Sequence, residues 1–117
     1  RMGFGSTRWL LTGDVEEAGE QWLVRRYGGM LSSHVVKVPH HGSSTSSGIP
    51  FVERVSQKDA PLHAVVSVGR HGRFGLPNSD VLSRWERYGA IVHSTSRQGA
   101  VWLRTDGEEI WRIPWRE

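Results

Sequence analysis

Two adjacent histidines and an aspartate are the residues of this sequence best suited to chemistry. His40 and His41 follow an apolar run over residues 35–38, and Asp14 closes a second apolar segment, Leu-Leu-Thr-Gly-Asp. Imidazole nitrogens and carboxylate oxygens are donors that zinc and manganese accept. Residues 43–47 all carry hydroxyls, which can donate to an anion such as phosphate. The pattern therefore points to a metal site beside a phosphate contact.

The neighbouring segments would have to bring these side chains to one place. Residues 8–12 and 34–38 have strand character, and residues 16–27 between them have the pattern of a helix. If the two strands are parallel neighbours joined by that crossover helix, their carboxyl ends meet at one edge of a sheet. Two other interpretations stay open at this point. Adjacent histidines in a loop are often only solvated, and Asp14 is also placed to cap the helix.

The rest of the chain alternates strand and helix patterns before it ends in glycine-marked turns. We predict an α/β fold with a mixed sheet, helices on it and an antiparallel C-terminal tail. Helices are predicted at residues 16–27, 50–56 and 79–88. The first of them should bury a stripe formed by Ala18, Trp22, Leu23 and Tyr27. Turns at 98–99 and 106–107 predict that the last strands, at 91–94, 100–104 and 110–113, form the tail.

The composition limits the kind of protein this can be. The chain has 117 residues, which suits one small domain, and its net charge is +3. Thirteen of the fifteen basic residues are arginine, which favours bidentate phosphate contacts, although a solvated basic surface explains a mild excess equally well. There is no cysteine, which excludes disulfides and thiolate metal sites. No apolar run approaches the roughly 20 residues of a membrane-spanning helix.

A glycine-flanked basic loop follows the predicted strand at 63–68. Arg70, His71 and Arg73 in this loop are candidates for phosphate contact, because loops at a strand's carboxyl end commonly form the mouth of a site. Ordinary solvated loop charge is the alternative. Asn78 and Ser79 follow closely, and either is placed to cap the helix that ends at residue 88.

Two motifs in register identify a family resemblance. Leu10-Leu11-Thr12-Gly13-Asp14 and Lys37-Val38-Pro39-His40-His41-Gly42-Ser43 resemble the metallo-β-lactamase-like domain at the C-terminus of ComEC-type DNA-internalisation competence proteins. The resemblance continues through residues 64–70, 73–75 and 80–82 and so covers most of the chain. It implies the second half of an αββα fold, with residues 1–117 as a single domain fragment, and a metal-dependent phosphodiesterase or nuclease acting on DNA.

The resemblance also implies roles for individual residues. Asp14 and His40 would be metal ligands for zinc or manganese in the complete domain, and His41 would be the catalytic partner of the phosphate. Further contacts to DNA would come from Ser43, Ser44, Arg70, His71, Arg73 and Asn78. The expected partners are DNA, in single-stranded form, the first half of the domain and an upstream membrane channel. The parent protein would then lie at the bacterial cell membrane, and the isolated fragment would self-associate.

Two departures from the family pattern leave the activity open. The family's His-x-His-x-Asp-His motif is absent from this sequence, and the family's Gly-His-Pro-His reads Gly75-Leu76-Pro77-Asn78 here. Three interpretations follow: half of a DNA-uptake nuclease domain, a non-catalytic DNA-binding remnant, and a purely structural domain. In each, the chain alone should fold and be catalytically silent, since two or three ligands leave a metal site open and weak.

Overall fold

A mixed sheet forms the centre of the computed structural model, which describes residues 1–56, 60–70 and 75–114. Its strands are, in spatial as well as chain order, β1 (Met2–Phe4), β2 (Thr7–Leu11), β3 (Val35–Lys37), β4 (Leu62–Val66) and β5 (Ala90–Ser94). β1 is antiparallel to β2, whereas β2, β3, β4 and β5 run parallel to one another. The α/β class and the mixed sheet are therefore confirmed.

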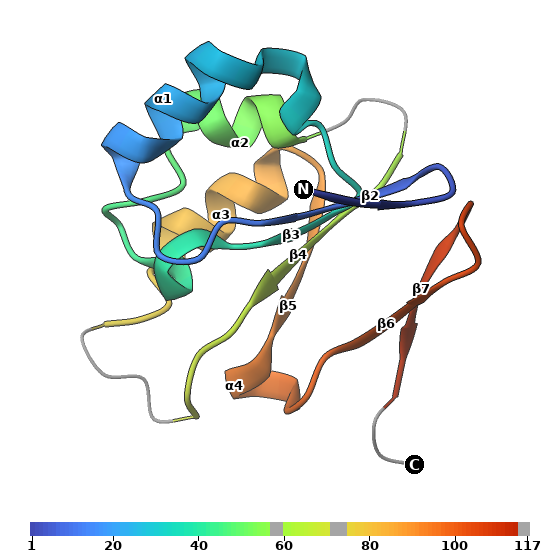
Figure 1. Cartoon of the computed structure of the whole chain (residues 1–117). Coiled ribbons are helices and arrows are strands. Elements are labelled where there is room, and N and C mark those ends of the chain that lie inside the picture. Colours follow the sequence, from blue (N-terminus) through green and yellow to red (C-terminus); the bar gives the residue numbers. More distant parts are fainter. Residues whose placement is uncertain (57–59, 71–74, 115–117) are drawn as a thin grey trace.

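Helices cover one face of this sheet (Figure 1). They are α1 (Glu17–Tyr27), α2 (Ile49–Val55) and α3 (Ser79–Arg87), and a short 3₁₀ turn, η1 (Gly28–Leu31), follows α1. Between them and the sheet lies an apolar core in which Val36, Phe51 and Trp85 are at most 1% exposed. Burying a side chain of this size stabilises the fold by about 1.5–3 kcal/mol, so the parallel strands and their helices form one unit.

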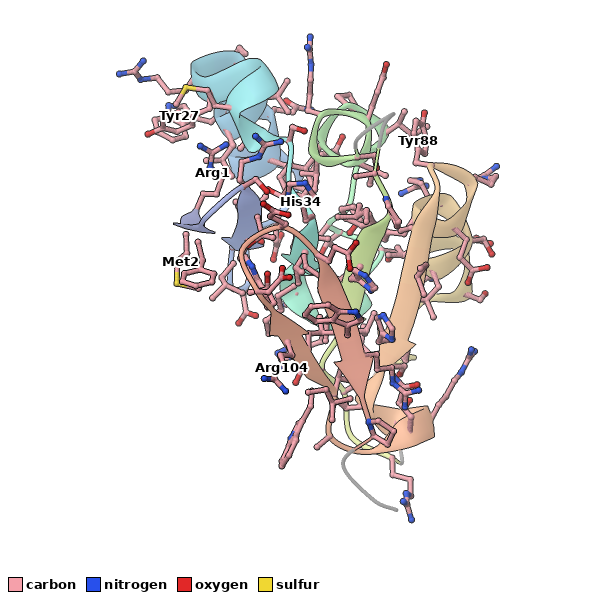
Figure 2. All side chains as sticks on the ribbon, turned by 90° about the vertical axis from the view of Figure 1, so that its right-hand side faces the viewer. Arg1, Met2, Tyr27, His34, Tyr88 and Arg104 are labelled. Carbon is pink, nitrogen blue, oxygen red and sulfur yellow. The ribbon has the colours of Figure 1, made fainter. Side chains whose placement is uncertain are left out.

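A separate antiparallel hairpin lies on the opposite side of the sheet from the helices (Figure 1). It consists of β6 (Trp102–Thr105) and β7 (Ile110–Ile113). Figure 2 views the molecule from this side, with the hairpin in front of the sheet and Arg104 on β6. Its turn is fixed by Asp106, whose Oδ1 accepts from the backbone N–H groups of Glu108 and Glu109 at 2.9 and 2.8 Å.

The predicted C-terminal tail is correct for the hairpin and wrong for the strand before it. β5 does not join the antiparallel tail but pairs in parallel with β4, Leu62 opposite Ala90 and Val66 opposite Ser94. The predicted glycine turn after β5 is the short helix α4 (Thr95–Gln98). The reason is that α3 already reverses the chain, so β5 returns as one more strand–helix–strand crossover.

The predicted buried stripe of α1 is correct at Leu23 and wrong at Ala18, Trp22 and Tyr27, which are exposed. Trp22 and Tyr27 are 52% and 41% exposed and meet each other edge to face, with ring centroids 5.9 Å apart. The residue that α1 buries is Glu20, at 1% exposure, with Leu23 and Val24 packed against the core beside it. α1 is therefore rotated to aim a carboxylate inward, which a pattern of apolar residues does not reveal.

The sheet face beneath the hairpin is only partly covered. An apolar groove of about 610 Å³ runs between the hairpin and the sheet, lined by residues that include Trp9, Val65 and Trp102. Leu11 on β2 and Ile91 on β5 are 55% and 49% exposed. No helix within the described residues is both long enough and apolar enough to cross a membrane.

Candidate metal and phosphate site

The turns after β2 and β3 meet at the carboxyl edge of the sheet. Leu11 at the end of β2 lies opposite Lys37 at the end of β3, so the chain leaves both strands at the same edge. The backbone N–H of His40 then donates to the carbonyl oxygen of Gly13 at 3.0 Å and ties the two turns together. The crossover arrangement expected from the sequence thus brings Asp14 and the histidines to one place.

His41 faces Asp14 across this junction. Its Nε2 lies 3.5 Å from Oδ1 of Asp14, and its Nδ1 lies 2.8 Å from the carbonyl oxygen of Ser67. A carbonyl can only accept, so Nδ1 carries the proton, and in the neutral ring Nε2 presents a lone pair to the Asp14 side. Both side chains reach solvent, His41 at 45% and Asp14 at 68% exposure. This is the tautomer that a metal-binding imidazole needs.

His40 makes a different set of contacts. Its Nδ1 lies 3.2 Å from Oγ1 of Thr45 and 3.7 Å from Oε1 of Glu16. Glu16, not Asp14, is the residue that precedes α1, and neither residue's side chain caps that helix. The alternative in which Asp14 serves as a helix cap is therefore excluded, and the histidine that pairs with Asp14 is His41.

The backbone that carries the histidines is left-handed. Within the turn η2 (Pro39–Gly42), φ is 52° at His40, 57° at His41 and 79° at Gly42. A non-glycine residue in this region costs of order 1–3 kcal/mol and persists only where surrounding contacts enforce it. One such contact is close packing of Gly42, where a Cβ would lie 2.8 Å from Cβ of Pro77. The two imidazoles are thus held in a strained, specified arrangement.

The hydroxyl segment folds back on itself beside the histidines. Oγ of Ser43 lies 2.9 Å from Oγ1 of Thr45 and accepts from the Thr45 backbone N–H at 3.2 Å. Ser46 is buried, and its hydroxyl donates to the carbonyl oxygen of Val15 at 2.6 Å. Ser44 is exposed and lines a cleft of about 360 Å³ between this segment and α1. Ser43 and Ser44, the expected phosphate contacts, therefore lie next to the histidine turn.

The end of the hydroxyl segment is anchored by the buried carboxylate of α1. Glu20 accepts from the backbone N–H groups of Ser47 and Gly48 at 2.6 and 2.8 Å. Arg84 Nη1 donates to the Ser47 carbonyl at 2.7 Å, and the Trp85 indole N–H donates to the Ser47 hydroxyl at 3.0 Å. Sequence reasoning missed this anchor, because Glu20 matches a solvent-facing helix residue and its partners are 27 or more positions away.

Burial raises the pKa of the Glu20 carboxyl above its ordinary value. The N–H groups of Gly48 and Ser47 oppose this shift, Glu17 adds to it and Arg84 counters it. The backbone N–H groups just before α2 therefore already bind a carboxylate from within the chain, that of Glu20.

Known proteins resemble the chain along most of its length. The Uncharacterized protein YcaI of Escherichia coli (strain K12) is 35% identical over 109 residues, which cover 93% of this chain. ComE operon protein 3 of Bacillus subtilis (strain 168) is 33% identical over 88% of the chain, and Competence protein ComA of Neisseria gonorrhoeae is 38% identical over 86%.

The chain is homologous to one segment of the ComEC-type competence proteins. It spans only 13% to 14% of the length of these relatives. No protein-family model matches the chain, and no solved structure does. The resemblance inferred from the two motifs is confirmed at the level of the family.

The remaining residues expected to contact DNA differ in what the structure shows of them. Arg70 is exposed in the loop after β4, and His71 and Arg73 lie outside the described residues. Asn78 caps α3, its Oδ1 accepting from the backbone N–H groups of Asp80 and Val81 at 2.9 and 3.2 Å. Of the two predicted caps, Asn78 is the one that the structure shows, and contact of these residues with DNA stays a prediction.

The donors that this segment offers fit part of a metal site. Two ligand atoms at their usual distances from a tetrahedral zinc lie roughly 3.4 Å apart. The observed 3.5 Å between Nε2 of His41 and Oδ1 of Asp14 is close to that spacing. Across the part of the chain that the structure describes, no group of three or more His, Cys, Asp and Glu side chains could hold a metal ion. Catalytic zinc usually takes three protein ligands, so further donors are needed.

Proposed function

We propose that this chain acts in DNA uptake, as part of a competence protein in which it contributes half of a metal-dependent DNA phosphodiesterase site. The observation that carries the proposal is the arrangement of His41, with its Nδ1 on the Ser67 carbonyl and its Nε2 on the Asp14 side. The names of two relatives, ComE operon protein 3 and Competence protein ComA, support the competence role.

In this proposal Asp14 and His41 hold the metal, and His40 contacts the phosphate. This exchanges the roles expected for the two histidines from the family resemblance, because Asp14 pairs with His41 while His40 lies 3.2 Å from the Thr45 hydroxyl. A bound divalent ion would lower the pKa of water towards about 7 and offset phosphate charge. The chain's own residues orient the substrate. His40 and the Ser43–Ser44 hydroxyls donate to phosphate oxygens, and Arg70 adds charge at the mouth.

The remaining parts of the site and of the protein are inferred from the same resemblance. The missing metal donors would come from a preceding half-domain that completes a metallo-β-lactamase-like αββα fold. The parent protein would lie at the bacterial membrane with its channel upstream, and the substrate would be single-stranded DNA. The chain alone would bind zinc or manganese weakly and would not cleave DNA, because two exposed donors leave most of the coordination to water.

A non-catalytic role in DNA binding is the second candidate, and one observation favours it. Leu76 and Asn78 stand where the family carries histidines, and the side-chain oxygen of Asn78 is engaged in capping α3. In that case the segment would retain phosphate contacts without turnover.

Cleavage of single-stranded DNA by the complete parent protein, with manganese or zinc added, separates the two candidates. The proposal expects metal-dependent cleavage that is lost in Asp14→Asn and retained in Glu86→Gln, an exposed carboxylate on α3. Binding of DNA with salt dependence but without cleavage would support the non-catalytic role instead.

A further inference from the structure

The carbonyl that orients His41 belongs to a residue outside the sheet. β4 ends at Val66, and Ser67 follows in a segment that has no strand partner among the described residues. A carbonyl in such a position would be free to turn unless its neighbours were held. Its 2.8 Å contact with Nδ1 of His41 lies on the side of β4 that faces β3, where the Val65 carbonyl accepts from the Val38 N–H at 2.8 Å, and keeping this direction past the end of the strand needs a contact that holds the backbone.

Thr95, at the start of α4, makes the contacts that hold this part of the backbone. Its Oγ1 accepts from the backbone N–H of Val68 at 2.8 Å and lies 2.7 Å from the carbonyl oxygen of Val68, to which it donates. The carbonyl of Val66 lies 3.4 Å from the same hydroxyl. One side chain thus engages the backbone on both sides of Ser67.

The position of Thr95 follows from the register of the sheet. Val66 lies opposite Ser94, the last pair of the β4–β5 ladder, so the next residues along the two strands are Ser67 and Thr95. α4 begins at Thr95 and turns its backbone away from β4. Beyond the last strand pair, the Thr95 hydroxyl therefore makes the hydrogen bonds to the backbone of Val68 that a continued β5 would have made.

We propose that Thr95 is a positioning residue for His41, which it serves by holding the Ser67 carbonyl on the Nδ1–H of the imidazole. The inference concerns the same site as the proposed function and gains its importance from it. A free imidazole in water prefers the proton on Nε2. In that tautomer Nε2–H would donate to the Asp14 carboxylate and would have no lone pair for a metal.

Thr95 therefore decides between two competing arrangements of one pair of side chains. With the Ser67 carbonyl fixed, the proton stays on Nδ1, and Nε2 offers its lone pair to a metal beside the Asp14 carboxylate. With the carbonyl released, His41 and Asp14 satisfy each other, and a metal must first displace that proton. Groups that orient a ligand in this way commonly change metal affinity by 10–100-fold when they are removed.

Nitrogen-15 NMR of the 117-residue chain, without metal and at a pH where the ring is neutral, tests the proposal. The wild-type His41 should show the Nδ1–H tautomer. Thr95→Val, which keeps the side-chain shape and loses the hydroxyl, should shift His41 towards Nε2–H, and Thr95→Ser should restore Nδ1–H. Thr105→Val is the matched control, because Thr105 Oγ1 accepts from Gly107 N–H in the distant hairpin turn at 3.0 Å. It should leave His41 unchanged.

The outcomes separate this proposal from the proposed function. An Nε2–H tautomer in the wild type overturns it, whether or not Thr95→Val folds, and so does an unchanged tautomer in a folded Thr95→Val. In the complete parent protein, Thr95→Val should weaken zinc binding about 10-fold or more while Thr105→Val does not. If the tautomer responds as expected but the parent protein does not cleave DNA, the positioning role stands and the nuclease function falls.

Discussion

The carboxylate of Glu20 holds the backbone N–H of Ser47 at 2.6 Å, joining the middle of α1 to the end of the hydroxyl segment. Ser47 is fully buried and has φ of 61°, a left-handed value that few serines adopt. Its N–H, carbonyl and hydroxyl are each bonded to a different side chain. The end of the segment that carries the proposed phosphate contacts is therefore fixed to the helical layer.

Replacing Glu20 with glutamine should destabilise the protein. The amide offers one acceptor oxygen where two backbone N–H groups need one each, so a buried donor loses its partner at a cost of about 1–3 kcal/mol. Urea unfolding measures this as a lower free energy of unfolding. Glu17→Gln is the matched control on the same helix, because Glu17 is exposed and should change the free energy by less than about 0.5 kcal/mol. Equal effects of the two changes would contradict the anchor.

Replacing Gly42 with alanine should distort the histidine turn. The position combines φ of 79° with a Cβ that would lie 2.8 Å from Cβ of Pro77, so either the turn or Pro77 must move. We expect a loss of about 1–3 kcal/mol in the free energy of unfolding, together with shifted His40 and His41 NMR signals. Gly29→Ala serves as the control, since a Cβ at Gly29 would meet nothing within 4 Å. Unchanged histidine signals in Gly42→Ala would show that the turn does not depend on this close packing.

Acidification should weaken the fold through a stacked pair of histidines, of which His93 is buried and His63 partly buried. Nδ1 of His63 lies 3.0 Å from Nε2 of His93, with the rings stacked at 18°. Burial lowers the pKa of His63, and burial together with the charges of His63 and Arg112 lowers the pKa of His93. The unfolded chain then binds more protons than the folded chain below about pH 6.5. The free energy of unfolding should therefore be highest above that pH and fall as the pH drops towards the lowered values.

His93→Gln tests the origin of this slope. It should flatten the loss of stability below about pH 6.5 when unfolding is followed from pH 8 to pH 5.5. Burial also lowers the pKa of His34, so part of the slope should remain in the variant. Glu20, whose pKa is raised, acts in the opposite sense and mainly in the range just above its ordinary value of 4.5. A slope that His93→Gln leaves unchanged would exclude the histidine pair as its source.

The basic loop after β4 should contribute to DNA binding rather than to folding. Arg70→Ala combined with Arg73→Ala should weaken binding of single-stranded DNA and lower the salt slope by about 1.4, or about 0.7 for each phosphate contact. The melting temperature should hardly change, because Arg70 is exposed. Arg54→Ala combined with Arg87→Ala removes the same charge from exposed positions on α2 and α3 and is the matched control. Equal losses of DNA affinity in the two double variants would show that the loop contributes only its net charge and no specific contact.

The sequence is sufficient to predict how this edge of the sheet forms, because the information is local. Apolar runs end at Gly13-Asp14 and at Pro39-His40, and a helix of crossover length lies between them, so parallel pairing places the two ends together. The helices at 49–55 and 79–87 follow from proline, asparagine and apolar spacing in the same way. Each of these features depends on neighbours within one turn or one strand.

Features set by distant contacts were beyond such reasoning. The inward rotation of α1 depends on Ser47 and Gly48, and the pairing of β5 with β4 depends on how α3 packs. Which histidine meets Asp14 depends on left-handed angles at His40 and His41, whereas an extended backbone would have sent the two rings to opposite sides. A sequence pattern contains no direct signal for any of these.

Metal titration of the complete parent protein, by calorimetry with zinc or manganese, tests the central claim that Asp14 and His41 hold the metal. His41→Ala and Asp14→Asn should each reduce metal affinity by at least about 10-fold, whereas His40→Ala should leave affinity within a few-fold and reduce DNA cleavage. Loss of metal binding in His40→Ala, with His41→Ala close to wild type, would contradict the assignment drawn from the 3.5 Å pairing of His41 with Asp14.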